Sequence, residues 1–350
     1  MSITLREINL QYEALIKTYK YLESKKQEIK NFYSQYQDLA INFVGCGSSF
    51  NLCQSGEFLI QSKLQKRSLA LAGGDLMLNI DNYKTIIEKS LTIIPSRSGS
   101  TSEILFAAKK IKDLNSNLPI ISIVCKEDSE ISQYSDLTLE IPWAFDESVC
   151  QTRSVTNLYT VILMLIAYFS NDSEKLNQIK TTIDNGNDFL DQLTPQLKDV
   201  ATLDWDNVVV LADGELQGLA TEGSLAFAEI SRTKSSYYHL LDVRHGPVVL
   251  INEKTLVILC IADYNQKYIN DLIKDLINRK ANIVIYSQEN IDIDDSNEKI
   301  IQINSKNKVS NDVLGISFIN IPQLLSYYKA KNQNINPDQP EGLDAWIKLG

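Results

Sequence analysis

Hydroxyl side chains are concentrated in the middle of the stretch LTIIPSRSGSTSEILFAAKK (residues 91–110). They lie between the apolar run at its start and the helical pattern at its end. Hydroxyl groups and the backbone amides at the start of a helix are donors suited to the oxygens of a phosphate group. An ordinary polar turn is the alternative, because Ser100 and Glu103 have the spacing of a capping box. Capping leaves the hydroxyl groups of Ser96, Ser98 and Thr101 without a role. Both interpretations stay open on spacing alone.

A second loop of this kind, VGCGSSF (residues 44–50), follows another apolar run. Gly45 and Gly47 permit a tight turn, and Ser48 and Ser49 would open the next helix. The loop is not a dinucleotide-binding fingerprint, because Phe50 stands where that motif has its last glycine. Two such loops after strands of one sheet could converge on one anionic ligand.

Two arginines could supply positive charge near these loops. Arg97 lies in the serine-rich loop, two residues before Gly99, and Arg153 lies in the stretch QTRSVTN. Either guanidinium could face a bound anion, although a surface ion pair is the commoner role of an arginine.

A predicted helix over residues 219–230 carries two carboxylates in apolar surroundings. Glu222 and Glu229 are seven residues apart, close to two helical turns, and therefore share one face. A carboxylate in a buried helix must be paired or must have a raised pKa. Glu229 is thus a candidate proton-transfer group, and a structural ion pair is the alternative.

The two histidines follow this helix. His245 lies in RHGP, where Gly246 and Pro247 predict a turn before a strand VVLI. Such a histidine is a candidate acid or base, although many turn histidines are only polar surface. His239, in YYHLL, is interpreted as strand packing.

Alternating apolar runs and helical patterns would position these residues. The runs LAINFVG, SLTIIPS and PIISIVC do not alternate between apolar and polar residues, which is typical of parallel strands buried by helices on both faces. This pattern predicts an α/β fold with mostly parallel sheets.

The same order of elements recurs in the second half of the chain. The segments DNVVVLADGELQG, KTLVILCIADYNQKYINDLI and ANIVIYSQE lie 166, 164 and 163 positions after their counterparts. Two near-equal domains are the simplest explanation, although any βα chain gives loose matches at some offset. The serine-rich turn becomes CIADYN in the second copy, so we expect the first copy to bind the ligand.

We therefore predict five segments. They are a helical segment at 1–34, a phosphate-binding domain at 35–171, a helical linker at 172–200, a second domain at 201–331, and a tail at 332–350 that closes the site.

Composition limits the possible partners. The net charge of -10 over 350 residues argues against a nucleic-acid surface or an anionic-membrane patch. Five cysteines without metal-ligand spacing indicate neither a disulfide framework nor a zinc site, and we expect no metal or redox cofactor. A reducing cytoplasm fits best, because the first residues do not resemble a secretion signal. The apolar stretch 155–169 is short for a bilayer and is expected to be a buried or interface helix.

The motifs GCGSSF, SRSGSTSE, QTRSVTN, EGSLAFAEIS and RHGP occur in an order and at distances that resemble the tandem sugar-isomerase (SIS) domains of the isomerase half of glucosamine-6-phosphate synthase. Stand-alone phosphosugar isomerases, fructosamine-6-phosphate deglycases and tagatose-6-phosphate ketose/aldose isomerase-like proteins are similar. The resemblance implies two SIS domains, each a three-layer, flavodoxin-like or Rossmann-like arrangement.

The resemblance also implies roles for individual residues. Glu229 would move a proton between C1 and C2 of the sugar, and His245 would assist ring opening. In the family this histidine reaches the neighbouring subunit's site, which implies a homodimer. The residues expected to bind the sugar 6-phosphate are Ser48, Ser49, Ser96, Arg97, Ser98, Gly99, Thr101, Thr152 and Glu222.

Two departures from the synthase narrow the expected activity. The chain begins without the N-terminal cysteine and glutaminase domain of the synthase. Ala345 stands where the synthase carries a Schiff-base lysine, and Lys348 is the nearest candidate replacement in the tail. The leading hypothesis is a phosphosugar isomerase. Loss of an amino group, as in a deglycase or deaminase, is the alternative, and a non-catalytic phosphosugar sensor is a third possibility.

Overall fold

The computed structural model describes residues 2–262, 266–293 and 299–345 of the chain. The chain divides into two compact units. The first unit comprises Leu10–Ile183 with the chain from Asp344 onward, and the second comprises Asp184–Leu343 with the residues up to Asn9. The five segment boundaries expected from the sequence stay a prediction.

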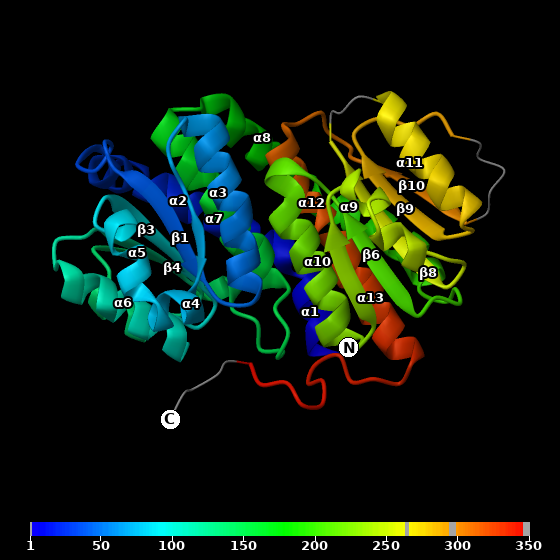
Figure 1. Ribbon diagram of the computed structural model, residues 1–350, viewed down its shortest axis with the longest axis horizontal. Helices are drawn as coiled ribbons and strands as arrows, with labels where there is room; N and C mark the ends of the chain where they lie inside the picture. Colours follow the sequence, from blue (N-terminus) through cyan, green and yellow to red (C-terminus); the bar gives the residue numbers. More distant parts are fainter. Residues whose placement is uncertain (1, 263–265, 294–298, 346–350) are drawn as a thin grey trace. The chain divides into compact units, whose positions relative to one another are not determined.

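The first unit is built on a five-stranded sheet in the order β2-β1-β3-β4-β5 (Figure 1). Each neighbouring pair of strands is parallel, as the apolar runs predicted. This strand order is that of flavodoxin-like folds. The strands are β1 (Ala40–Gly45), β2 (Ala70–Ala72), β3 (Ser90–Ser96), β4 (Ile120–Val124) and β5 (Leu137–Glu140).

The second unit repeats the arrangement in its own sheet, β10-β9-β8-β6-β7. Read from its other edge, the order is again second, first, third, fourth and fifth strand, and each pair is parallel. β6, β8 and β9 occupy the positions of β1, β3 and β4, so the internal repeat is confirmed. The strands are β6 (Asn207–Leu211), β7 (Lys234–Tyr238), β8 (Thr255–Ile261), β9 (Asn282–Ser287) and β10 (Ile300–Asn304).

Helices flank both sheets. Those of the first unit are α2 (Gln11–Ser34), α3 (Ser48–Leu64), α4 (Gly73–Leu78), α5 (Ile80–Ile87), α6 (Ser102–Leu114) and α7 (Arg153–Ser170), followed by α8 (Ser173–Asp184) at the boundary between the units. Those of the second unit are α1 (Ile3–Asn9), α9 (Gly186–Val200), α10 (Gln217–Ile230), α11 (Gln266–Asn278), α12 (Asn311–Phe318) and α13 (Asn320–Asn332).

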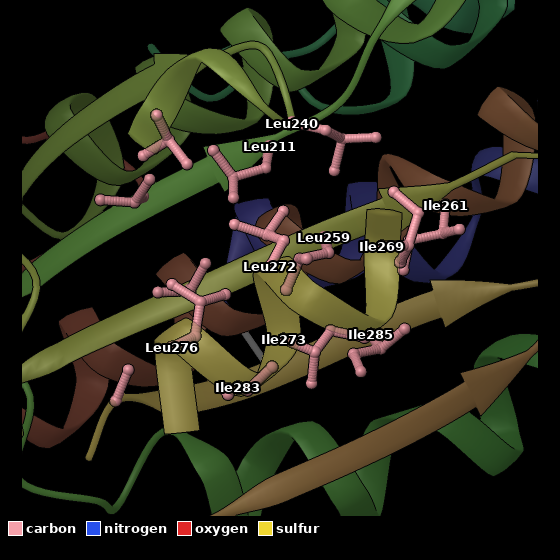
Figure 2. Packing of buried hydrophobic residues seen from close by; sticks show 14 of the residues in the cluster. Leu211, Leu240, Leu259, Ile261, Ile269, Leu272, Ile273, Leu276, Ile283 and Ile285 are labelled. Carbon is pink, nitrogen blue, oxygen red and sulfur yellow. The ribbon is translucent and has the colours of Figure 1, made fainter. Parts of the chain in front are cut away.

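Alternate residues of each strand face opposite helices. In the second unit, Leu211, Leu259 and Ile285 point toward α11, which contributes Leu272 and Leu276 to one apolar cluster (Figure 2). In the first unit the corresponding cluster joins β1, β3 and β4 to α4, α5 and α6. Burial of these side chains holds the strands in register and fixes where each strand ends.

The apolar stretch 155–169 lies in α7, and the prediction that it is buried is confirmed. The 18 residues of α7 are long and apolar enough to cross a membrane by composition, but 89% of them are buried inside the structure. The helix packs against α2 and α3. This position identifies α7 as a core helix of the first unit.

A buried carboxylate holds the N-terminal end of α7. The two oxygens of Asp146 accept hydrogen bonds from the backbone amides of Thr152 (2.9 Å), Arg153 (3.1 Å) and Ser154 (2.9 Å). The Ser154 hydroxyl also donates to Asp146, over 2.5 Å. Helix ends leave several amides without helical partners, and here one side chain accepts from three of them.

We expect Asp146→Ala to lower the free energy of unfolding by about 3 kcal/mol, because it leaves buried amide donors unpaired. Urea unfolding followed by circular dichroism measures this loss. Asp113→Ala is the matched control, since Asp113 lies exposed on α6 and we expect a change within about 0.5 kcal/mol. Equal stability of the two variants would show that Asp146 does not hold α7 in place.

Candidate functional site

A pocket lies at the carboxyl edge of the first sheet, where β1 and β3 end. It lies within the first unit, and its free space of about 30 Å³ holds roughly two water molecules. Both loops predicted to converge contribute to it. The lining residues are Cys46, Ser49, Pro95, Ser96, Arg97, Ser98, Thr101, Ile104, Gln151 and Ala345.

The serine-rich loop after β3 is organised by its own hydroxyl groups. Ser96 Oγ accepts a hydrogen bond from the amide of Gly99 (3.0 Å), and Ser98 Oγ accepts one from the amide of Ser100 (3.2 Å). Each hydroxyl accepts a bond from the loop in this way and keeps its own hydrogen for another acceptor. The two serines are therefore suited to donate to an anion in the pocket.

The alternative interpretation, a capping box formed by Ser100 and Glu103, is wrong. The helix α6 begins at Ser102 with Thr101 as its N-cap, and no side chain caps it. The Ser100 hydroxyl donates to the Ser98 carbonyl instead (3.3 Å). Gly99 has a φ of +61° and lies against Ser129, so this position in the turn requires a residue without a side chain. Because Gly99 is not helical, α6 begins only after Ser100.

The loop after β1 has the tight turn that its glycines predicted. Gly47 has a φ of +53°, and a side-chain carbon on Gly45 would meet the Phe50 amide at 2.7 Å. The helix α3 begins at Ser48 as expected, and Ser48 and Ser49 are each 4% exposed. Of these two serines, Ser49 lines the pocket.

Cys46 also lines this pocket, which the sequence interpretation missed. Burial raises the pKa of its thiol to about 11, and Glu103 raises it further, whereas the amides of Gly73 and Gly74 lower it. The thiol is therefore neutral near pH 7 and adds no negative charge. The glycines on either side of Cys46 were the sequence signal for this position, because residues without a side chain let the backbone approach a pocket closely.

Arg97 is buried, so the alternative of a surface ion pair is wrong. Its guanidinium donates to the carbonyls of Ser148 (2.9 Å), Val149 (3.0 Å) and Ala345 (2.5 Å). The bond to Ala345 holds the tail at the pocket wall. Its charge remains beside the serines, but its hydrogen-bond donors are largely engaged with backbone oxygens.

Thr152 and Arg153 belong to the N-terminal end of α7. Thr152 is fully buried and donates to Asp146 through its amide and its hydroxyl (3.3 Å). Arg153 donates to the Phe145 carbonyl. Neither lines the pocket, whereas the preceding Gln151 does.

The tail contributes one described residue to the pocket. Ala345 lies in the pocket wall. Lys348 lies outside the described residues. No group of three or more His, Cys, Asp or Glu side chains that could hold a metal ion occurs among the residues that the structure describes.

In the second unit, both predicted glutamates lie on α10. Glu222 is buried, with 3% of its surface exposed, whereas Glu229 is partly exposed near the C-terminal end of the helix. The prediction that both carboxylates lie in a buried helix is therefore correct for Glu222 and wrong for Glu229. The partial exposure leaves Glu229 accessible to a small molecule from solvent.

His245 is exposed and follows a short 3₁₀ turn, Asp242–Arg244. The strand predicted at VVLI is wrong, because Pro247–Leu250 forms another 3₁₀ turn. Val249 and Leu250 are 71% and 64% exposed. An apolar run can thus be read as a strand although neither sheet extends to it.

The interpretation of His239 as strand packing is also wrong. It follows β7, and its side chain is 46% exposed. Its Nδ1 lies 2.8 Å from Oδ1 of Asp213 and 3.1 Å from the hydroxyl of Tyr237. The sequence signal was the position of Asp213, two residues after the end of β6, because parallel pairing places the loops that follow β6 and β7 at one edge of the sheet.

The sequence of the chain is similar to that of several known proteins. Residues 36–168 match the family model described as SIS domain. The chain is 27% identical over 319 residues to a glutamine–fructose-6-phosphate aminotransferase [isomerizing] from Wigglesworthia glossinidia brevipalpis, covering 87% of this chain and 50% of that protein. The chain spans about half the length of the curated relatives it matches.

Solved structures have the same fold over nearly the whole chain. A glucosamine-6-phosphate deaminase from Thermotoga maritima is 25% identical, with a TM-score of 0.78, covering 99% of this chain and 100% of that one. A tagatose-6-phosphate ketose/aldose isomerase from Escherichia coli is 20% identical, with a TM-score of 0.85, covering 100% and 96%. Residues 36–168 therefore match an SIS domain, as the resemblance of the sequence motifs implied, and the chain shares its fold with these solved structures.

Proposed function

We propose that this protein is an isomerase that interconverts the aldose and ketose forms of a sugar 6-phosphate. The observation that carries the proposal is the pair of serine hydroxyls, Ser96 and Ser98, whose lone pairs accept from the loop while their hydrogens stay available in the pocket. Such donors suit a phosphate group. The names of relatives, which include an isomerizing aminotransferase and a ketose/aldose isomerase, support the substrate class.

In the proposed reaction, the phosphate binds the loop formed by Ser49, Ser96, Ser98 and Thr101, with Ser48 and Gly99 shaping its surroundings. The pocket is small while Ala345 lies in its wall, so binding requires the tail to withdraw. Glu229 then takes a proton from the carbon next to the carbonyl and returns it to the neighbouring carbon through an enediol. His245 assists opening of the sugar ring. Proton transfer of this kind contributes about 10²–10⁴-fold, and positioning supplies more.

Loss of an amino group is the second candidate function. The Thermotoga maritima relative, a glucosamine-6-phosphate deaminase at 25% identity over its full length, favours it. Transfer of the same proton in a 2-amino sugar phosphate gives an imine, and addition of one water molecule to this imine then releases ammonia and leaves the ketose phosphate. Glu222 and Lys348 would assist sugar binding in either reaction, whereas Thr152, which is fully buried, would hold the end of α7 beside the pocket. A cytoplasmic location, and catalysis without a metal or cofactor, complete the proposal.

Incubation in D₂O with fructose, glucosamine or tagatose 6-phosphate tests the reaction. We expect NMR to show deuterium at C1 or C2 of the sugar. The rate of this exchange should fall about 10²–10⁴-fold in Glu229→Gln, because the amide cannot accept the proton. Released ammonia would select the deaminase. Binding without exchange, unaltered in Glu229→Gln, would instead identify a sensor and contradict an enzyme.

The phosphate loop is tested by Ser98→Ala. We expect KM for the active sugar phosphate to rise about tenfold or more, with a smaller change in kcat, because one hydrogen bond to a charged group is lost. Ser100→Ala is the matched control, since its hydroxyl donates to a loop carbonyl and does not line the pocket. Equal KM values for the two variants would place the phosphate elsewhere.

A homodimer in which His245 reaches the neighbouring subunit is part of the proposal. The exposed Val249 and Leu250 beside His245 support it, because exposed apolar clusters often mark protein interfaces. We expect light scattering to give a dimer for the wild type and a monomer for Val249→Asp/Leu250→Asp. Leu78→Asp, at a site 74% exposed in the first unit, should remain dimeric. A monomeric wild type would contradict the proposal.

A further inference from the structure

A second pocket lies in the first unit at the opposite edge of the sheet from the serine-rich loop. It surrounds the amino ends of β1 and β3 and the segment 66–69 before β2, and its volume is about 780 Å³. This volume is typical of small-molecule sites. The lining residues are Ala40, Asn42, Gln61, Gln65, Lys66, Arg67, Ser68, Leu69, Thr85, Ile86 and Lys89.

Two polar groups of this pocket wall lack partners. Asn42 is 1% exposed, and its Oδ1 accepts the Leu69 amide (3.0 Å), which leaves Nδ2 as a donor with no hydrogen bond in the described part of the chain. Ser68 is 4% exposed, and its Oγ likewise has no partner among the described residues. Buried polar groups without partners are rare in native proteins, and each needs an explanation.

The charge of the lining indicates the sign of a ligand. The pocket contains Lys66, Arg67 and Lys89 and no acidic residue, although the whole chain has 44 acidic and 34 basic side chains. Lys66 donates to the carbonyls of Gln37 and Leu39. Arg67 and Lys89 form no ion pair with a carboxylate in the described ranges, so their charges are available to an anion.

Apolar surface in the same lining indicates the body of the ligand. Leu69 and Ile86 are large apolar side chains, 36% and 37% exposed. An inorganic anion would leave them in water, whereas an organic anion would cover them and meet the basic side chains. We propose that this pocket is a second binding site, for a small organic anion with an apolar body, whose polar atoms are recognised by Asn42 and Ser68.

The probe for this site is 1-naphthalenesulfonate, added to the full chain in the presence of saturating inorganic phosphate to occupy the serine-rich loop. We expect saturable binding by ¹H–¹⁵N NMR, with movement of the Asn42 side-chain amide signals, assigned through their absence in Asn42→Asp. Arg67→Glu/Lys89→Glu should weaken binding about tenfold or more, because both cations are exposed and their reversal leaves the fold intact.

Matched variants separate specific recognition from general attraction. Lys109→Glu reverses the charge of an exposed residue of α6 and should leave the affinity for 1-naphthalenesulfonate unchanged. Ser68→Ala keeps the charge and should weaken binding severalfold. Equal affinity of wild type and Arg67→Glu/Lys89→Glu, or unmoved Asn42 signals, would overturn the proposal and leave water as the occupant of the pocket. These outcomes do not depend on isomerase activity.

Discussion

Parallel strand pairing is the constraint on which the candidate phosphate site depends. Because the strands of the first sheet run in one direction, the loops after β1 and β3 leave at the same edge. That edge brings Ser49 together with Ser96 and Ser98, although almost fifty residues separate them. Antiparallel pairing would place these loops at opposite ends of the strands. The buried side chains that hold the register therefore also determine the shape of the pocket.

The serine-rich loop uses each hydroxyl twice. As an acceptor, the oxygen of Ser96 or Ser98 fixes the position of a loop amide, and the hydrogen of the same hydroxyl stays available for an acceptor in the pocket. Neutral donors suit this place because Arg97 is engaged with three backbone carbonyls. Loop shape and ligand recognition therefore reside in the same atoms, and a substitution affects both.

Local patterns in the sequence predicted the elements that local forces determine. The buried runs became parallel strands, the repeat appeared as two sheets of equal order, and α3 begins at Ser48. Two of the errors concern residues whose partners are distant in sequence. Arg97 meets Ala345, 248 positions away, and His239 meets Asp213, 26 positions away. The capping box failed for a local reason, since the left-handed Gly99 delays the start of α6. The spacing of residues along the chain does not predict contacts such as those of Arg97 and His239.

The bond from Arg97 to the Ala345 carbonyl gives the pocket an internal competitor. While it is formed, a backbone oxygen occupies the wall that an entering anion would approach. Under the proposed withdrawal of the tail, the apparent dissociation constant equals the intrinsic one divided by the fraction of molecules whose tail has withdrawn. Any change that weakens the hold on the tail would tighten binding without touching a single group that contacts the anion.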